Sequence, residues 1–196
     1  SPQPAASDNY AASAVAAAAS EADGVVIDTA RGEATVPANP ERIAVYDWGM
    51  LDTLGKLGVD VGATTTNIRL GYLQDAARNM QPVGTLFEPD YEALHAFAPQ
   101  LIITGSRTAP AFEQLSKLAP TIEMTADTTK MRESTEARID AFAKIFHKEA
   151  EAQALKKEID ESFAAAKAAA QGKGSGLVLL VNGGKMSACG PDSRFG

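Results

Sequence analysis

Short apolar strands alternate with helical segments between residues 25 and 124, and this alternation constrains the fold more than any other feature of the sequence. The clearest strands are Ile43–Tyr46 and Leu101–Thr104, each almost entirely apolar and each followed by a helical pattern. A strand that is apolar throughout is buried on both faces, which is typical of a parallel sheet covered by helices. The sequence therefore predicts an α/β lobe built on a parallel, Rossmann-like sheet.

The other expected elements complete this lobe, which spans residues 25–129. A small hairpin with a glycine turn, Val25–Val36, precedes the first sheet strand. Asp47 is placed to cap the helix after that strand, and Pro99 and Pro120 end two later helices. The further elements are a strand over Val59–Thr64, helices over Tyr91–Ala98 and Ala111–Leu118, and a strand over Thr121–Met124.

A segment without strand signals, residues 130–174, follows the lobe. Its apolar residues repeat at helical spacing, and a helix over Glu149–Gln171 would be about 35 Å long at ~1.5 Å per residue. A new apolar strand, Leu177–Val181, then opens the segment 175–196. We interpret this last segment as the truncated start of a second lobe.

The composition is that of an ordinary globular chain with few means for catalysis. Residues 1–24 are rich in Ala and Ser, which indicates a flexible tether, with an Ala-rich helix as the alternative. The net charge of −7 without a block of like charges argues against a nucleic-acid partner. Cys189 is the only cysteine, and His95 and His147 lie far apart, so we assign no metal ligand and no cofactor.

Candidate binding residues follow the ends of the predicted strands. In open α/β sheets, ligands bind outside the carboxyl ends of the strands, and Arg107 follows one such end. Its guanidinium offers a rigid fork of donors and a permanent charge, which suits an anionic ligand. Tyr46 and Trp48 flank the end of another strand, where aromatic rings can stack on a ligand. Asn67, with its neighbours Thr65 and Arg69, follows a third strand end.

Two stretches carry a family resemblance. The first runs Val83-Gly84-Thr85-Leu86-Phe87-Glu88-Pro89-Asp90-Tyr91-Glu92-Ala93-Leu94, followed by Ala98-Pro99-Gln100-Leu101-Ile102-Ile103. The second is Asn182-Gly183-Gly184-Lys185-Met186-Ser187-Ala188, with Ser193-Arg194-Phe195-Gly196 at the end of the chain. Together they resemble the siderophore-binding branch of the bilobal binding proteins of ABC importers, in which one long helix joins two α/β lobes.

The resemblance implies a periplasmic protein that captures an iron(III)–siderophore complex without chemistry and delivers it to a permease. Arg107 and Arg194 would then hold the anionic chelate, and Glu92 would dock on the permease. A lipid tether is compatible with the Ala/Ser-rich lead. Because little of the second lobe follows, we expect weak binding or none by this chain alone, and the apolar strand Leu177–Val181 could mediate self-association.

Three alternatives stay open from the sequence. The first is an importer binding protein for another substrate, such as cobalamin or haem. The second is an enzyme on a doubly wound fold, although Ser106 has neither a nearby histidine nor a Gly-x-Ser-x-Gly frame. The third is a structural or adhesion lobe without a ligand.

Overall fold

The computed structural model describes the backbone of residues 24–173, 178–182 and 185–189, and the side chains of residues 24–172. The chain forms two compact units, which divide between Lys148 and Glu149. The first unit holds the sheet, the hairpin and α6 (Met131–Phe146). The second holds the long helix α7 (Glu149–Lys173) and one strand pair. The helical segment 130–174 is therefore shared between the units.

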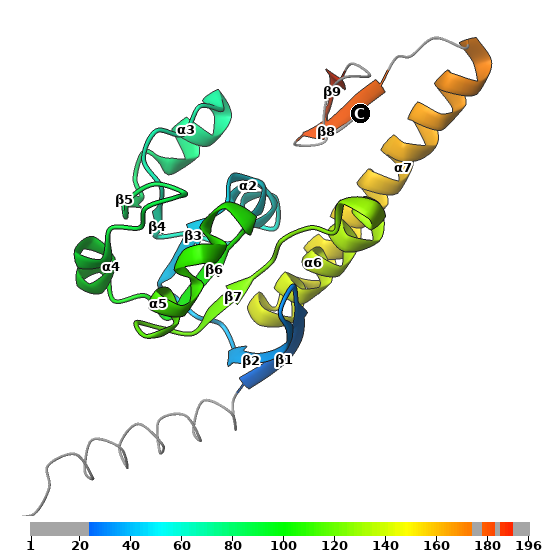
Figure 1. Ribbon diagram of the computed structural model, residues 1–196. Coiled ribbons are helices and arrows are strands. Elements are labelled where there is room, and N and C mark those ends of the chain that lie inside the picture. The colour runs from blue at the N-terminus through cyan, green and yellow to red at the C-terminus, as the bar shows by residue number, and fades with distance from the viewer. Residues whose placement is uncertain (1–23, 174–177, 183–184, 190–196) are drawn as a thin grey trace, which may run out of the picture. The chain divides into compact units, whose positions relative to one another are not determined.

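A five-stranded sheet forms the centre of the first unit (Figure 1). Its strands, in spatial order, are β5 (Gln81–Pro82), β4 (Ala63–Thr64), β3 (Ile43–Tyr46), β6 (Leu101–Thr104) and β7 (Thr121–Glu123). All neighbouring pairs are parallel. Every residue of β3 and β6 is buried, as expected for strands covered on both faces. The predicted parallel sheet is confirmed.

The strand order creates a switch point between β3 and β6. From β3 the chain moves outward to β4 and β5, and then returns to place β6 on the other side of β3. The segments that leave the carboxyl ends of β3 and β6 therefore run in opposite directions along the sheet. A crevice at such a point is where open α/β sheets bind their ligands.

Helices and short 3₁₀ turns connect these strands. In the first unit they are α2 (Trp48–Lys56), α3 (Gly71–Ala77), α4 (Tyr91–Phe97), η1 (Ser106–Ala111), α5 (Phe112–Ser116), η2 (Thr128–Lys130) and α6. Asp47 caps α2 by accepting from the Met50 amide at 2.8 Å, as predicted. Ala98 is the C-cap of α4 and lies directly before Pro99. In the part of the chain that the structure describes, none of the helices has the length and apolar character needed to cross a membrane.

The structure differs from the sequence prediction around two of these elements. The strand expected over Val59–Thr64 shortens to β4, because the amide of Val59 donates to the Leu54 carbonyl and closes α2 instead of joining the sheet. The helix expected from Ala111 begins earlier, as the 3₁₀ turn η1. α3 and β5 were not predicted, since their short polar sequences carry little periodic signal.

The predicted hairpin is present as β1 (Gly24–Thr29) and β2 (Gly32–Pro37), which pair antiparallel. Its turn is fastened to the edge of the sheet by Arg31. The Arg31 guanidinium lies 2.9 Å from a carboxylate oxygen of Glu123 and 4.0 Å from the ring centre of Phe112. The amide of Ala30 adds a hydrogen bond to the Glu123 carbonyl. The hairpin therefore covers the β7 edge rather than extending the sheet.

Both long helices are present, and in α7 the apolar stripe predicted at Leu155, Ile159 and Phe163 is buried only at its first two positions, since Phe163 is 43% exposed. In α6, Ile139, Phe142 and Phe146 are buried, as their spacing of three and then four residues indicates. α7 extends the predicted helix by two residues. In the second unit, β8 (Val178–Asn182) pairs antiparallel with β9 (Lys185–Cys189). The apolar strand expected over Leu177–Val181 is therefore paired within the chain.

Candidate functional site

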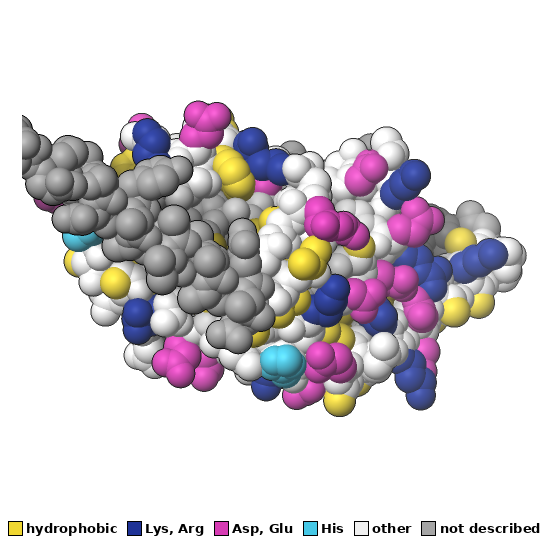
Figure 2. Space-filling view, turned by 90° about the horizontal axis from the view of Figure 1, so that it is seen from below, with side chains coloured by type: hydrophobic (Ala, Val, Ile, Leu, Met, Phe, Trp, Pro, Cys, Tyr) yellow, Lys and Arg dark blue, Asp and Glu magenta, His cyan; other side chains and the backbone are white. Residues whose placement is uncertain are grey.

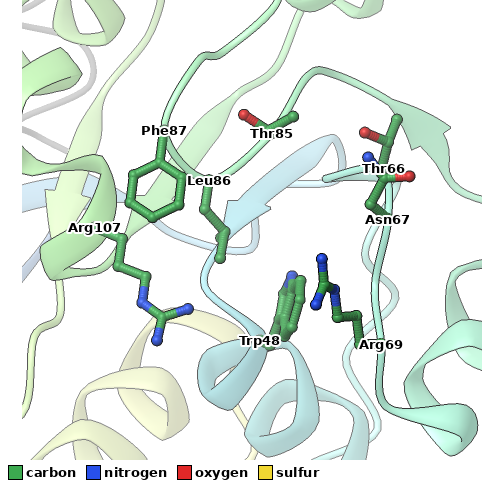
Figure 3. Close-up of a pocket in the computed structure, with 8 residues that line it drawn as sticks. All are labelled: Trp48, Thr66, Asn67, Arg69, Thr85, Leu86, Phe87 and Arg107. Atoms are coloured by element: carbon green, nitrogen blue, oxygen red, sulfur yellow. The ribbon is translucent and has the colours of Figure 1, made fainter.

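A cavity of about 370 Å³ lies in the first unit at the carboxyl edge of the sheet (Figure 3). Its walls come from the segments that follow β3, β4, β5 and β6, so four neighbouring strand ends contribute. The lining residues are Trp48, Thr66, Asn67, Arg69, Thr85, Leu86, Phe87 and Arg107. We call this cavity the switch-point pocket. It includes Arg107, Trp48 and Asn67, three residues that the sequence singled out.

Trp48 forms one wall of the pocket. It is the first residue of α2, directly after β3. Its indole Nε1 donates to the Thr65 hydroxyl at 2.9 Å, and the side chain is half-buried. A ring held on its polar edge keeps one face available for stacking on a planar ligand. Trp48, one of the two aromatic residues that the sequence offered for stacking, therefore lines the pocket.

Tyr46, which was also predicted to stack on a ligand, is not among the residues that line the pocket. Its side chain is 1% exposed and packs among core residues that include Ala44 and Ile102. The phenol hydroxyl donates to the Val83 carbonyl at 2.7 Å, and burial raises the pKa of that hydroxyl. β3 is buried on both faces, so no residue within it can present a ring to solvent. Tyr46 therefore packs in the core beneath the pocket and does not line the pocket.

The loop between β5 and α4 supplies the opposite wall. Gly84 has a φ of +102°, and a Cβ at this position would collide with the backbone of Glu88, Pro89 and Asp90. The Thr85 amide donates to the Glu88 carbonyl at 2.9 Å and closes the turn. This turn carries Phe87, which is 70% exposed, at the rim of the pocket. The stretch Val83–Leu94, which carries part of the family resemblance, therefore also forms a wall of the pocket.

Thr108 joins three segments around the pocket. Its side chain is 1% exposed. The hydroxyl lies 2.5 Å from the Leu86 carbonyl and 3.3 Å from the Tyr46 carbonyl. It therefore connects η1, which carries Arg107, to the end of β3 and to the Gly84 turn. Sequence reasoning missed Thr108 because a buried threonine next to an arginine has no signature of its own.

Asp47 lies behind Arg107 at the switch point. Its carboxylate caps α2 and leaves no room for a Cβ on Gly105, the residue that follows β6. Burial raises the pKa of this carboxyl, while the Met50 amide and the charges of Arg138 and Arg107 act in the opposite direction. Arg138 is itself partly buried, and burial lowers the pKa of its guanidinium. The largely buried carboxyl of Asp47 therefore interacts electrostatically with both guanidinium groups.

The remaining predicted residues are not part of this pocket. Glu92 is exposed in the first turn of α4, and it does not line the cavity. Arg194 lies outside the described residues, as do the side chain of Cys189 and every other side chain beyond 172. Among the residues that the structure describes, no three His, Cys, Asp or Glu side chains are grouped so that they could hold a metal ion.

Comparison with known proteins places the chain in a family. The profile of the periplasmic binding protein family matches residues 43–196, so the chain belongs to that family. It is 39% identical over 165 residues to the petrobactin-binding protein YclQ of Bacillus subtilis, covering 82% of this chain and 52% of YclQ. It is 28% identical over 182 residues to the ferric-anguibactin-binding protein FatB of Vibrio anguillarum, covering 88% of this chain and 56% of FatB.

Solved structures give the same grouping. The crystal structure of YclQ matches with a TM-score of 0.76 and 36% identity, covering 88% of this chain and 63% of that one. The catecholate-siderophore-binding protein VctP of Vibrio cholerae matches with a TM-score of 0.72 and 29% identity, with the same coverages. The chain spans about half the length of the curated relatives that it matches. The predicted family and fold class are confirmed.

Replacing Thr108 by Val keeps the side-chain shape and removes the hydroxyl. We expect the free energy of unfolding to fall by about 1–3 kcal/mol, because two buried carbonyls lose their shared donor. Urea denaturation followed by circular dichroism measures this change. The control is Thr53→Val, which removes a hydroxyl bonded to the Gly49 carbonyl on an exposed helix surface and should cost less than about 0.5 kcal/mol. Equal losses in the two variants would contradict the role given to Thr108.

Asp47 and Asp127 are both helix-capping aspartates, and their pKa values are shifted in opposite directions from the ordinary value of 3.8. Hydrogen bonds from Thr129 lower the pKa of Asp127, whereas burial raises that of Asp47. As the pH rises above 3.8, the Asp47 carboxyl of the unfolded chain loses its proton, whereas that of the folded protein still keeps it. Stability contributed by Asp47 falls as the pH rises through its folded pKa.

The replacements Asp47→Asn and Asp127→Asn keep a capping acceptor and remove the titration. The free energy of unfolding should be measured from about pH 3 to about pH 7. The stability of the wild type relative to Asp47→Asn should decrease as the pH rises. Relative to Asp127→Asn it should increase, because a lowered pKa stabilises the folded protein only after ionisation. Slopes of the same sign would refute the assigned environments.

Proposed function

We propose that this chain belongs to the solute-binding component of an ABC importer and captures an iron(III)–siderophore complex at the switch-point pocket. The observation that carries the proposal is the placement of Arg107 and Trp48 on the two segments that diverge at the switch point. The names of the relatives support the ligand class, since YclQ binds petrobactin and FatB binds ferric anguibactin.

The chemistry of the pocket suits a large anionic chelate. The Arg107 guanidinium can donate paired hydrogen bonds to the oxygens that surround the iron. The indole of Trp48 and the exposed ring of Phe87 offer apolar faces to catechol or similar rings. Thr66, Asn67 and Thr85 add small polar groups around the rim. This set of groups binds and orients a ligand, and we propose capture without a chemical step.

Delivery to a permease would use a different surface. Glu92 is an exposed carboxylate on α4, away from the residues that line the pocket. Exposed charges of this kind steer transient protein complexes. We propose that Glu92 contacts the permease while the ligand stays bound at the strand ends, and that Arg194 adds a second cation from the following lobe. A location in the periplasm, with or without a lipid tether, is consistent with these roles.

Replacing Arg107 by Gln tests the proposal. The probe is the trianionic iron(III) complex of a hexadentate tricatecholate. It is added to the intact natural protein. We expect affinity to fall by about 10-fold to 100-fold, because a charge-assisted hydrogen bond contributes about 1.5–3 kcal/mol. Isothermal titration calorimetry measures the dissociation constant.

Arg78→Gln is the matched control, since Arg78 is an exposed arginine on the same unit that pairs with Asp75 at 2.8 Å. It should leave the dissociation constant unchanged within about 2-fold. If Arg107→Gln and Arg78→Gln bind the chelate equally well, Arg107 is not part of the binding site. If the wild type binds no ferric siderophore, the proposed function fails.

A further inference from the structure

The arginines of the first unit divide into two groups. Most of them have partners within the described residues: Arg31 with Glu123, Arg42 with the Ala98 carbonyl, Arg78 with Asp75, Arg132 with Glu136, and Arg138 with the Met124 carbonyl and Thr135. Arg69 and Arg107 are the exceptions. Neither has a hydrogen bond or an ion pair among the described residues, and both line the switch-point pocket.

The topology places these two arginines on either side of Trp48. Trp48 follows β3, Arg69 follows β4, and Arg107 follows β6. In the sheet, β4 and β6 are the two neighbours of β3. Figure 3 shows both guanidinium groups directed inward from opposite sides of the pocket, with the indole of Trp48 between them in that view.

The loop that carries Arg69 is held at several points. Ile68 is 6% exposed, and its carbonyl accepts from the Gln74 side chain at 2.5 Å. On the other side, the Thr66 amide donates to the Gly84 carbonyl at 2.8 Å. Asn67, between these anchors, has a φ of +59°, which a residue other than glycine adopts rarely. The backbone at Arg69 is therefore fixed, although its side chain is exposed.

The charges in the pocket are unbalanced. None of the described lining residues is acidic, so two positive charges face the cavity without a carboxylate beside them. Asp47 attracts Arg107 from behind, but it does not line the pocket. In a chain with a net charge of −7, a pocket with two unpaired guanidinium groups is an exception to the general charge pattern. Such a site attracts anions and disfavours neutral or cationic ligands.

We propose that Arg69 is a further binding cation of the first unit, which acts with Arg107 as a two-armed clamp on a multiply anionic chelate seated against Trp48. This inference rests on the proposed function and narrows it. The ligand that this clamp favours has an aromatic ring for Trp48 and anionic oxygens on both sides of that ring. A ferric catecholate or a carboxylate-bearing chelate has such groups. A neutral iron(III) trihydroxamate of similar size lacks these charges and is discriminated against.

The experiment compares Arg69→Gln and Arg69→Lys with the wild type, in the protein as it is naturally produced. Each is titrated with the trianionic iron(III) tricatecholate and with a neutral iron(III) trihydroxamate, at low and high salt. Arg69→Gln should bind the tricatecholate about 10-fold more weakly and with a weaker salt dependence. Its affinity for the trihydroxamate should change by less than about 3-fold. Arg69→Lys should recover part of the loss, because it keeps the charge without the planar fork.

Arg78→Gln again serves as the control, and thermal melting checks that each variant is folded. If Arg107→Gln weakens tricatecholate binding while Arg69→Gln does not, the clamp is refuted and the proposed function stands. If Arg69→Gln weakens both chelates equally, selection by charge is refuted. If the wild type binds neither chelate, the proposed function fails and the clamp fails with it.

Discussion

The parallel pairing of β3 with β6 is the constraint on which the rest of the site depends. Ile43–Tyr46 lies against Leu101–Thr104 residue for residue, and both strands are fully buried. The chain must leave these neighbouring strands in opposite directions, and the divergence opens the pocket. Two features keep its walls in place: the close approach of the Asp47 carboxylate to Gly105, which leaves no room for a side chain there, and the Thr108 hydroxyl, which lies between the carbonyls of Leu86 and Tyr46.

Electrostatics then decides what the pocket can accept. Hydrogen bonds or ion pairs satisfy the arginines elsewhere in the described first unit, but Arg69 and Arg107 keep their guanidinium groups directed toward the cavity. The space-filling view in Figure 2 shows acidic and basic side chains intermixed over another face of the molecule. The concentration of unpaired positive charge is therefore local, and an acidic protein can still present a site for an anion.

Much of this arrangement could be predicted from the sequence, because it depends on local signals. The apolar runs gave β3 and β6, Asp47 marked the start of α2, and the position after β6 identified Arg107. Tyr46 was misassigned because the sequence does not show where burial ends along the chain. Tyr46, the last residue of β3, is still buried, and the pocket begins only at Trp48. Thr108 and the anchoring of the Arg69 loop depend on contacts between segments distant in sequence, and no periodic pattern records such contacts.

The most direct test locates the iron. Crystals of the naturally produced protein with the trianionic iron(III) tricatecholate should be measured at the iron absorption edge, where anomalous scattering gives the position of the metal. The chelate should occupy the switch-point pocket, with a ring against Trp48 and its oxygens hydrogen-bonded to the guanidinium groups of Arg107 and Arg69. A chelate bound at another surface, with this pocket filled only by solvent, would contradict this prediction.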